Sequence, residues 1–146
     1  QPYHQILVHA GDMTSRLESF HETEIILNAI HSHRVRNKLY REVILQASAT
    51  NTPLEYGIIE INLDAINDDL KSKILNAQRP LGGLLNEYKI QYTSSPQCYF
   101  KLTANSRISE ILKTNVSDTL YGRCNILSIK EEILANIVEI IPVISK

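Results

Sequence analysis

The sequence predicts a single α+β domain built on a mainly antiparallel sheet of about six strands. Its 146 residues are the usual size of one domain, and 43% apolar residues is ordinary for a folded protein. Ile, Leu and Val supply most of that apolar content, and segments rich in them are joined by short polar turns, which is typical of hairpins. We therefore expect one domain over residues 1–146. The chain begins with Gln1 rather than Met, so truncation at the N-terminus is left as an alternative.

The charge balance argues against a nucleic-acid partner. Asp and Glu number 16 against 15 Lys and Arg, which gives a formal net charge of −1. Proteins that bind nucleic acids usually carry a basic excess that neutralises phosphates. Aromatic residues, which would stack on bases, make up only 6% of the chain. The sequence also contains no run of about 18 apolar residues, so we expect no membrane-spanning segment.

The N-terminal third changes from helix to strand. Residues 1–9 are compatible with the end of a helix, and Asp12 or Thr14 would cap a short helix over about residues 13–20. Residues 24–35 are rich in branched side chains and contain neither Gly nor Pro, which predicts a strand.

Residues 39–48 and 54–63 predict a hairpin around a polar turn. On the first of these strands Leu39, Val43 and Leu45 share one face with Arg41, because side chains alternate along a strand. An arginine that points toward a core must find an anion, either in the protein or on a ligand.

The pattern after residue 63 predicts a helix and then a loop. Apolar residues at helical spacing favour a helix over residues 64–77, which must end before Pro80. The following RPLGGLL segment is expected to be a loop in which Gly82 and Gly83 allow a close approach of the backbone.

The C-terminal part predicts two strands, a short helix and a last hairpin. The two strands, over residues 88–95 and 97–104, lie on either side of Pro96. A short helix is expected over residues 105–114. The hairpin joins residues 119–129 to residues 133–144 through a turn of charged residues.

Motifs for metal, redox or phosphate chemistry are weak in this sequence. His31 and His33 lie two residues apart and so share a face of a strand, but no third ligand at a recognisable spacing completes a metal site. Cys98 and Cys124 belong to no C-x-x-C motif. We expect no metal and no cofactor.

Charged residues inside apolar strands are the strongest functional signal. Arg41, Arg123 and Glu139 each lie among branched or aromatic residues. Arg41 and Glu139 would either pair with each other across the sheet or form a site for a small carboxylated molecule. In such a site the guanidinium would bind the carboxylate in bidentate fashion, and Glu139 would accept a hydroxyl proton or transfer one.

Five short segments, in this order, resemble the chorismate lyase (chorismate pyruvate-lyase) family, and most of all its cyanobacterial and plastid branch. The resemblance covers about residues 5–142, and its segments are GDMTSRLE, LYREVIL, RPLGGLL, LYGRCNI and IVEIIP. It implies one α+β domain in which helical flaps close over a buried site. It also implies a monomeric lyase, in a cytoplasm or plastid stroma, that converts chorismate to 4-hydroxybenzoate and pyruvate for quinone biosynthesis without a cofactor.

The resemblance also assigns site residues. It implies that Arg41 binds a substrate carboxylate and that Glu139 faces the ring hydroxyl, so that these two are the catalytic pair. Met13 and Leu81, with Gly82, would offer backbone amides, and Arg123 matches a basic position that we expect to bind substrate. Family members often carry Arg where this chain has Gly83, and that departure removes a cation from the expected pocket.

A second interpretation comes from the same superfamily. The effector-binding domains of a large group of bacterial transcription regulators share this fold, and residues 105–127 resemble their C-terminal pattern. Such a domain senses a small molecule and converts nothing. Those regulators also carry a winged-helix DNA-binding domain, for which 146 residues leave no room. A purely structural protein would explain the hairpins but not Arg41 and Glu139 inside apolar strands. The sequence thus favours the lyase, with the effector-binding domain as the alternative.

Overall fold

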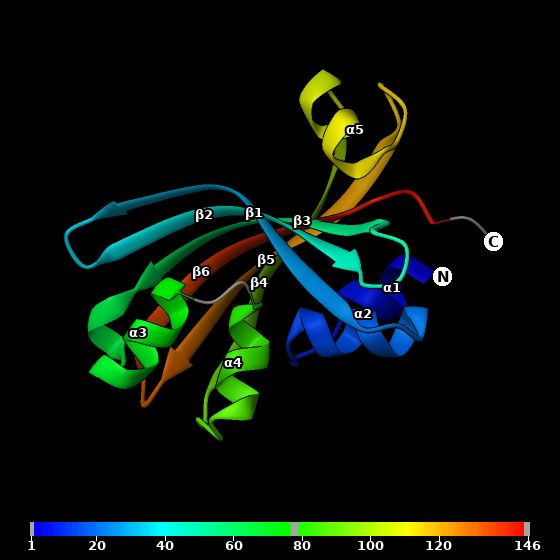
Figure 1. Cartoon of the computed structure of the whole chain (residues 1–146). Helices are drawn as coiled ribbons and strands as arrows, with labels where there is room; N and C mark the ends of the chain where they lie inside the picture. Colours follow the sequence, from blue (N-terminus) through cyan, green and yellow to red (C-terminus); the bar gives the residue numbers. More distant parts are fainter. Residues whose placement is uncertain (1, 77–78, 145–146) are drawn as a thin grey trace.

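Six antiparallel strands form one curved sheet in the computed structural model, which describes residues 2–76 and 79–144 (Figure 1). The order across the sheet is β1-β2-β3-β6-β5-β4, so the C-terminal hairpin inserts between β3 and β4. The strands are β1 (Ile25–Val35), β2 (Lys38–Ala47), β3 (Pro53–Asn62), β4 (Thr93–Thr103), β5 (Thr119–Ile129) and β6 (Glu132–Ile141). This architecture confirms the predicted fold class.

Hairpins supply most of the pairing, as the sequence predicts. β2 pairs with β3, and β5 pairs with β6, in the two hairpins expected from the alternating segments. The pairing of β3 with β6 joins the two halves of the sheet and places Gly57 opposite Glu139. On the other side of β6, Glu139 lies opposite Arg123 of β5.

The helices α2 and α5 begin where a polar side chain accepts a hydrogen bond from a free backbone N–H group. Asp12 Oδ2 accepts from Ser15 N at 2.8 Å at the start of α2, and Asn105 Oδ1 accepts from Ile108 N at 2.9 Å at the start of α5. The helices of the described part are α1 (Pro2–Leu7), α2 (Met13–His21), α3 (Asp68–Asn76), α4 (Leu81–Glu87) and α5 (Ser106–Leu112). None of them is long and apolar enough to cross a membrane.

The helix predicted over residues 64–77 begins later than expected. A short 3₁₀ turn, η1 (Leu63–Ala65), comes first, and Asn67 then accepts a hydrogen bond from Leu70 N at 2.8 Å at the start of α3. The side chain of Asn67 therefore caps this helix. Residue 77, the last of the predicted helix, lies outside the described residues.

Two local predictions were wrong. The expected loop over RPLGGLL is the helix α4, because Leu81, Leu84 and Leu85 together bury one face of it against the sheet. The two strands expected around Pro96 are the single strand β4, whose register shifts between Pro96 and Cys98. β4 lies at the edge of the sheet, where a proline without an N–H group is tolerated, particularly at a bulge.

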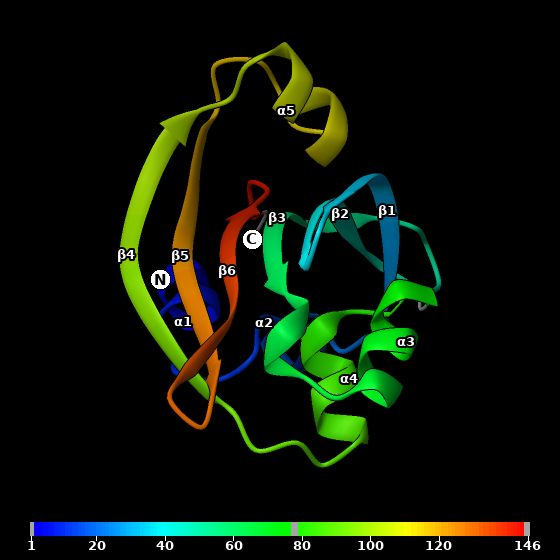
Figure 2. The same ribbon diagram turned by 90° about the vertical axis from the view of Figure 1, so that its left-hand side faces the viewer.

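The two faces of the sheet are covered unequally. Figure 1 shows α1 to α4 on one side of the sheet and α5 on the other. Figure 2 shows how the sheet curves around the side that α2, α3 and α4 occupy. The core on this side contains two clusters of buried apolar residues, one under α3 and α4 and one under α1 and α2. The site described next lies between these two clusters.

Candidate functional site

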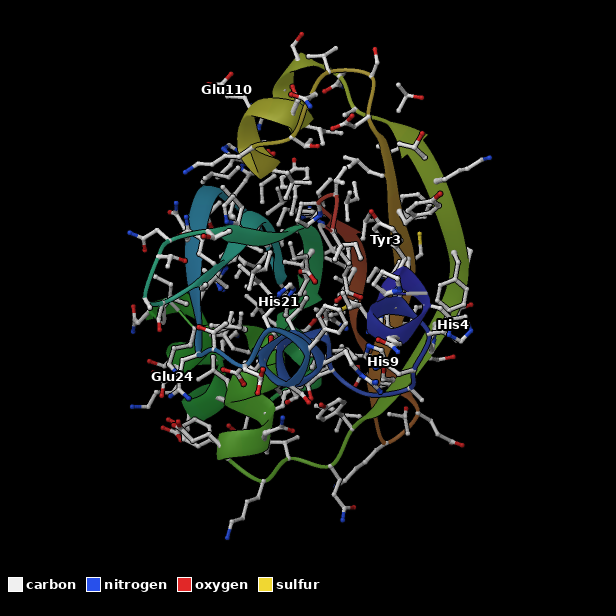
Figure 3. All side chains as sticks on the ribbon, turned by 90° about the vertical axis from the view of Figure 1, so that its right-hand side faces the viewer. Tyr3, His4, His9, His21, Glu24 and Glu110 are labelled. Atoms are coloured by element: carbon white, nitrogen blue, oxygen red, sulfur yellow. The ribbon has the colours of Figure 1, made fainter. Side chains whose placement is uncertain are left out.

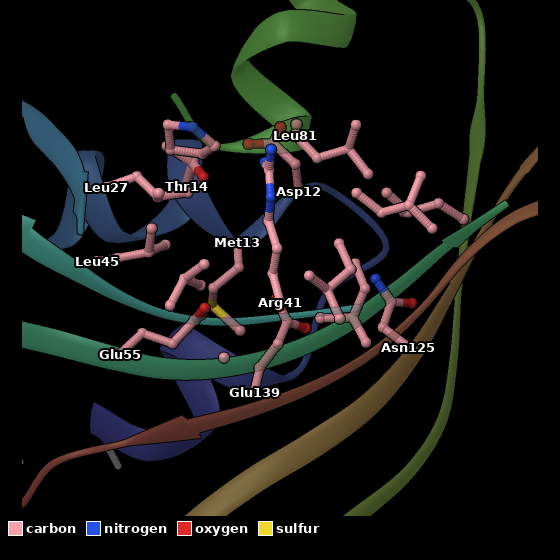
Figure 4. A pocket seen from close by; sticks show the side chains of 18 residues that line it. Asp12, Met13, Thr14, Leu27, Arg41, Leu45, Glu55, Leu81, Asn125 and Glu139 are labelled. Carbon is pink, nitrogen blue, oxygen red and sulfur yellow. The ribbon is translucent and has the colours of Figure 1, made fainter. Parts of the chain in front are cut away.

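A cavity of about 70 Å³ lies between the inner face of the sheet and the first turns of α2 and α4 (Figure 4). By the measure of roughly 10–15 Å³ per water, it holds on the order of five waters or a molecule of a few heavy atoms. Most of its wall is apolar and comes from β2, β3 and β6. The polar side chains of its lining belong to Asp12, Thr14, Arg41, Glu55, Asn125 and Glu139.

The alternation of side chains along three strands builds this lining. Arg41 on β2, Glu55 on β3 and Glu139 on β6 all lie on the inner face. Gly57 lies between them in the middle of the sheet, opposite Val43 on one side and Glu139 on the other. Because Gly57 has no side chain, the side chains of Glu55 and Val43 approach its backbone closely at the cavity floor, where an added Cβ atom would lie 3.1 Å from each.

Arg41 is buried but has no acidic partner. Its exposure is only 9%, and its Nη2 donates to the carbonyl oxygen of Ile74 at 2.5 Å. No acidic side chain of residues 2–76 and 79–144 forms an ion pair with it, so the pairing with Glu139 that the sequence leaves open does not occur. Burial lowers the pKa of Arg41, yet a guanidinium stays charged in proteins and has five N–H groups to donate. Arg41 is therefore a cation with donors left for a ligand.

Arg123 is the residue that pairs with Glu139. Its Nε donates to Glu139 Oε1 at 2.7 Å, and the arginine is fully buried. Its remaining groups donate to the carbonyl oxygens of Leu7, His9 and Gly11 at 3.4, 2.8 and 3.2 Å. The sequence analysis assigns Arg123 to substrate binding, but its side chain does not line the cavity. It lies behind the cavity, where it positions Glu139 and the connection between α1 and α2.

Glu139 lines the cavity next to its partner. It is 3% exposed. Burial raises the pKa of Glu139, and the charge and hydrogen bond of Arg123 act in the opposite direction. One oxygen of Glu139 is engaged by Arg123, so the other oxygen is the one that a ligand could reach.

Glu55 is the functional candidate that the sequence analysis missed. It is 3% exposed, it lines the cavity, and its Oε1 has no hydrogen-bond partner among the described residues. Burial, and then the nearby charge of Glu139, raise the pKa of Glu55 well above the ordinary range, whereas the charge of Arg123 opposes this shift. The alternation that identifies Arg41 on its strand would have identified Glu55 too, since Glu55 alternates in phase with Gly57 and Ile59.

The remaining predicted residues lie where the two helices meet over the cavity. Met13 opens α2 and Leu81 opens α4, and both line the cavity together with Gly82. A Cβ atom on Gly82 would lie 2.9 Å from the Cβ of Asp12, so the close approach expected of this glycine is present. Asp12 also accepts hydrogen bonds from Asn86 and Tyr92, which tie the start of α2 to α4 and to the segment that follows α4. The roles of Arg41, Glu139, Met13, Leu81 and Gly82 in binding stay predictions.

His9, in the connection that Arg123 holds, makes the stability depend on pH (Figure 3). Its Nδ1 accepts from Gly11 N at 3.1 Å, and burial, followed by the charges of Arg123 and Arg16, lowers its pKa from 6.5 to about 4. Between these values the unfolded chain binds the proton and the folded chain does not, so stability falls as the pH falls through this window.

We expect the free energy of unfolding to drop more steeply between pH 6.5 and 4 for the wild type than for a His9→Asn variant, whose side chain does not titrate. Urea unfolding at a series of pH values measures both curves. The contributions of Glu55 and Glu139 cancel in the comparison, because both proteins contain them. Parallel curves would show that His9 is not desolvated in the folded protein.

The residues considered for metal or redox chemistry lie away from the cavity. His31 and His33 are exposed on β1 after a shift in register. Cys98 and Cys124 face each other across β4 and β5 as free thiols. Among residues 2–76 and 79–144 no three His, Cys, Asp or Glu side chains are grouped so that they could hold a metal ion.

The fold is similar to that of several solved structures. No family model and no curated protein matches the sequence. PhnF from Mycobacterium smegmatis superposes with a TM-score of 0.69 at 8% identity, over 92% of this chain and 65% of PhnF. The chain thus spans less than two thirds of PhnF.

Two separately solved domains also match. The ligand-binding domain of a putative GntR-family transcriptional regulator from Bordetella bronchiseptica gives a TM-score of 0.61 at 10% identity, over 82% of this chain and 85% of that domain. The C-terminal domain of the histidine utilization repressor from Pseudomonas syringae gives 0.60 at 9% identity, over 82% and 92%. The chain has the chorismate lyase-like fold. At these identities the similarity establishes the fold alone.

These matches correct the enzymatic interpretation. The sequence favours a lyase that acts on chorismate in quinone biosynthesis, but the similar structures named above include the ligand-binding domain of a putative GntR-family transcriptional regulator and the C-terminal domain of a repressor. The expectation of a lyase is therefore wrong, and the cyanobacterial and plastid branch receives no support from the sequence comparisons. The resemblance led to the correct fold because lyases and effector domains share it, but it gave the wrong function within that fold.

Proposed function

We propose that this chain is the effector-binding domain of a transcription regulator, which binds a small molecule and does not convert it. The observation that carries the proposal is the buried cavity under α2 and α4, with an unpaired guanidinium in a mostly apolar wall. Ligand sites in proteins are typically concave and apolar with a few polar groups that orient the ligand. The ligand-binding domain from Bordetella bronchiseptica supports the same function, since it has this fold.

The arrangement of the helices supports a sensing role. α2 and α4 meet over the cavity through Asp12, Gly82 and Asn86. A ligand in the cavity would contact Met13 at the start of α2 and Leu81 at the start of α4. Binding would therefore favour one arrangement of these two helices over others, which is how a ligand changes the population of protein states. The predicted monomer and the location in a cytoplasm or plastid stroma stay predictions.

An Arg41→Met variant is expected to bind anionic ligands about 10- to 100-fold more weakly than the wild type. The change keeps an unbranched apolar side chain but removes charge-assisted hydrogen bonds of about 1.5–3 kcal/mol each. A thermal-shift screen of small carboxylates and phosphates selects a ligand, and isothermal titration calorimetry then measures its dissociation constant in both proteins.

A Lys38→Met variant is the matched control. Lys38 is also a cation of β2, but it is exposed and pairs with Glu60 at 3.2 Å outside the cavity. Binding should be unchanged in this variant, and the ligand should be recovered chemically intact from the wild type. Equal binding by wild type and Arg41→Met would remove Arg41 from the site. A screen in which no compound binds would contradict the proposed function.

A further inference from the structure

Two carboxyl groups meet at the floor of the cavity above Gly57. A Cβ atom on Gly57 would lie 3.1 Å from Glu55 Oε2, so the carboxyl group of Glu55 extends over this glycine. Glu139 lies directly opposite Gly57 on the neighbouring strand. The floor of the cavity at this glycine is thus bordered by an acid on each side. A ligand group at this part of the floor faces two carboxyl groups at once.

Only one of these two acids has a partner. Arg123 engages Glu139, and its other recorded hydrogen bonds go to backbone carbonyl groups. Glu55 Oε1 is buried and without a partner among the described residues, although buried polar atoms are nearly always hydrogen-bonded in folded proteins. An exception of this kind, aimed into a cavity, points to a donor that a ligand supplies.

At the other end of the cavity, the cation Arg41 lacks an anionic partner among residues 2–76 and 79–144. Figure 4 shows the side chain of Arg41 extending from the sheet toward the helices, whereas Glu55 and Glu139 lie at the sheet. Arg41 forms no ion pair within the described residues, so neither acid neutralises it. The cavity therefore presents a cation with free donors at one end and an acid without a donor at the other.

We propose that the ligand of this cavity is a small zwitterion of the amino-carboxylate class, whose ammonium group binds Glu55 and Glu139 at the cavity floor and whose carboxylate binds Arg41. This assignment rests on the proposed function, because it names the ligand of the same site. An ammonium group has three N–H donors, which suit the free oxygens of two carboxyl groups. A plain acid would leave Glu55 without a donor, and a plain amine would leave Arg41 without an anion.

Because of the charge balance at the cavity floor, a proton is released when the ammonium group binds. Arg123 is one cation for two acids, so Glu55 is the acid that holds a proton, in agreement with the direction of its pKa. The other charged groups around this floor are Asp12, above Glu139, and Arg41. A ligand ammonium would replace the proton on Glu55, so one proton leaves for each ammonium group that binds.

The size of the cavity restricts the ligand to a few heavy atoms, since its volume is about 70 Å³. A series of unbranched amino acids tests both charge and length: glycine, β-alanine, γ-aminobutyrate and δ-aminovalerate. Each member has two matched controls, the carboxylic acid without the amine and the amine without the acid. Calorimetry is expected to show one amino acid that binds at least ten-fold more tightly than both of its controls.

Glu55→Gln is the decisive variant, because the amide keeps the shape of the neutral carboxyl group and cannot become an anion. We expect it to weaken binding of that amino acid about ten-fold or more. Titrations in two buffers with different ionisation enthalpies should show close to one proton released per ligand in the wild type and none in Glu55→Gln. Glu60→Gln is the matched control on the same strand, outside the cavity, and should bind like the wild type.

The outcomes separate this inference from the proposed function. Acids that bind as tightly as the corresponding amino acids, or an unchanged affinity in Glu55→Gln, would overturn the zwitterion while effector binding stands. A series in which no amino acid binds would overturn it as well. The wider screen of carboxylates and phosphates then decides separately whether the cavity binds an effector.

Discussion

Replacing Arg123 by Met is expected to lower the free energy of unfolding by about 3–5 kcal/mol. The arginine is fully buried, and its loss would leave the carboxylate of Glu139 without its partner in a low-dielectric interior. Three backbone carbonyl groups, of Leu7, His9 and Gly11, would lose a donor at the same time. Breaking a buried pair is costly mainly because of the group that stays behind.

Urea unfolding monitored by circular dichroism measures this effect. The matched control is Arg107→Met, because Arg107 pairs with Glu42 at 2.6 Å on the protein surface. Exposed pairs contribute about 0–1 kcal/mol, so this control should unfold almost like the wild type.

A double variant, Arg123→Met with Glu139→Leu, should recover part of the lost stability, since it removes the orphaned carboxylate. It should not recover all of it, because the three carbonyl groups still lack donors. A loss below about 1 kcal/mol in Arg123→Met would mean that the pair is not a supporting part of the site.

The sequence revealed the strands because their signal is local. Leu39, Val43 and Leu45 share one face of β2 with Arg41, and the alternation of side chains along a strand is enough to place Arg41 on the inner face. The same argument also applies to Glu55, whose neighbours in phase are Gly57 and Ile59. Glu55 is therefore identifiable as an inner-face acid without any further information.

The helix α4 could not be expected from local preferences. Gly82 and Gly83 are poor helix formers, and their segment resembles a loop. What makes the segment helical is tertiary: Leu81, Leu84 and Leu85 bury one face against the sheet, and Gly82 lets the helix approach Asp12. Burial of such a face outweighs the low helix propensity of two glycines.

The partner of Glu139 depended on one irregularity in the sheet. Ile129 lies opposite Glu132, and an unbroken ladder from that pair would place Arg123 opposite Val138. The register shifts between Leu127 and Ser128, and this shift places Arg123 opposite Glu139 instead. The sequence predicts the hairpin but carries no clear sign of this bulge, so the ion pair of Arg123 with Glu139 was not predictable.

Gly122→Ala and Gly83→Ala are expected to change stability in opposite directions. A Cβ atom at Gly122 would lie 2.5 Å from the carbonyl oxygen of Glu139 and 2.6 Å from Phe100 Cζ. Phe100 can turn aside, but the carbonyl group is part of the β5–β6 ladder and cannot move without disturbing it. Overpacking of this kind costs about 1–3 kcal/mol. At Gly83 nothing lies within 4 Å of the added atom, and Ala stabilises a helix by about 0.5–1 kcal/mol relative to Gly.

Chemical denaturation of the two variants and the wild type measures the change in the free energy of unfolding, which we expect to be a loss for Gly122→Ala and a gain for Gly83→Ala. Because Gly122 precedes Arg123 and its neighbour in the clash is Glu139, the strain falls on the backbone that carries the buried ion pair. Gly122→Ala should therefore also weaken ligand binding, whereas Gly83→Ala should not. Loss of stability without any change in affinity would mean that the position of Glu139 in the cavity does not depend on the β5–β6 ladder.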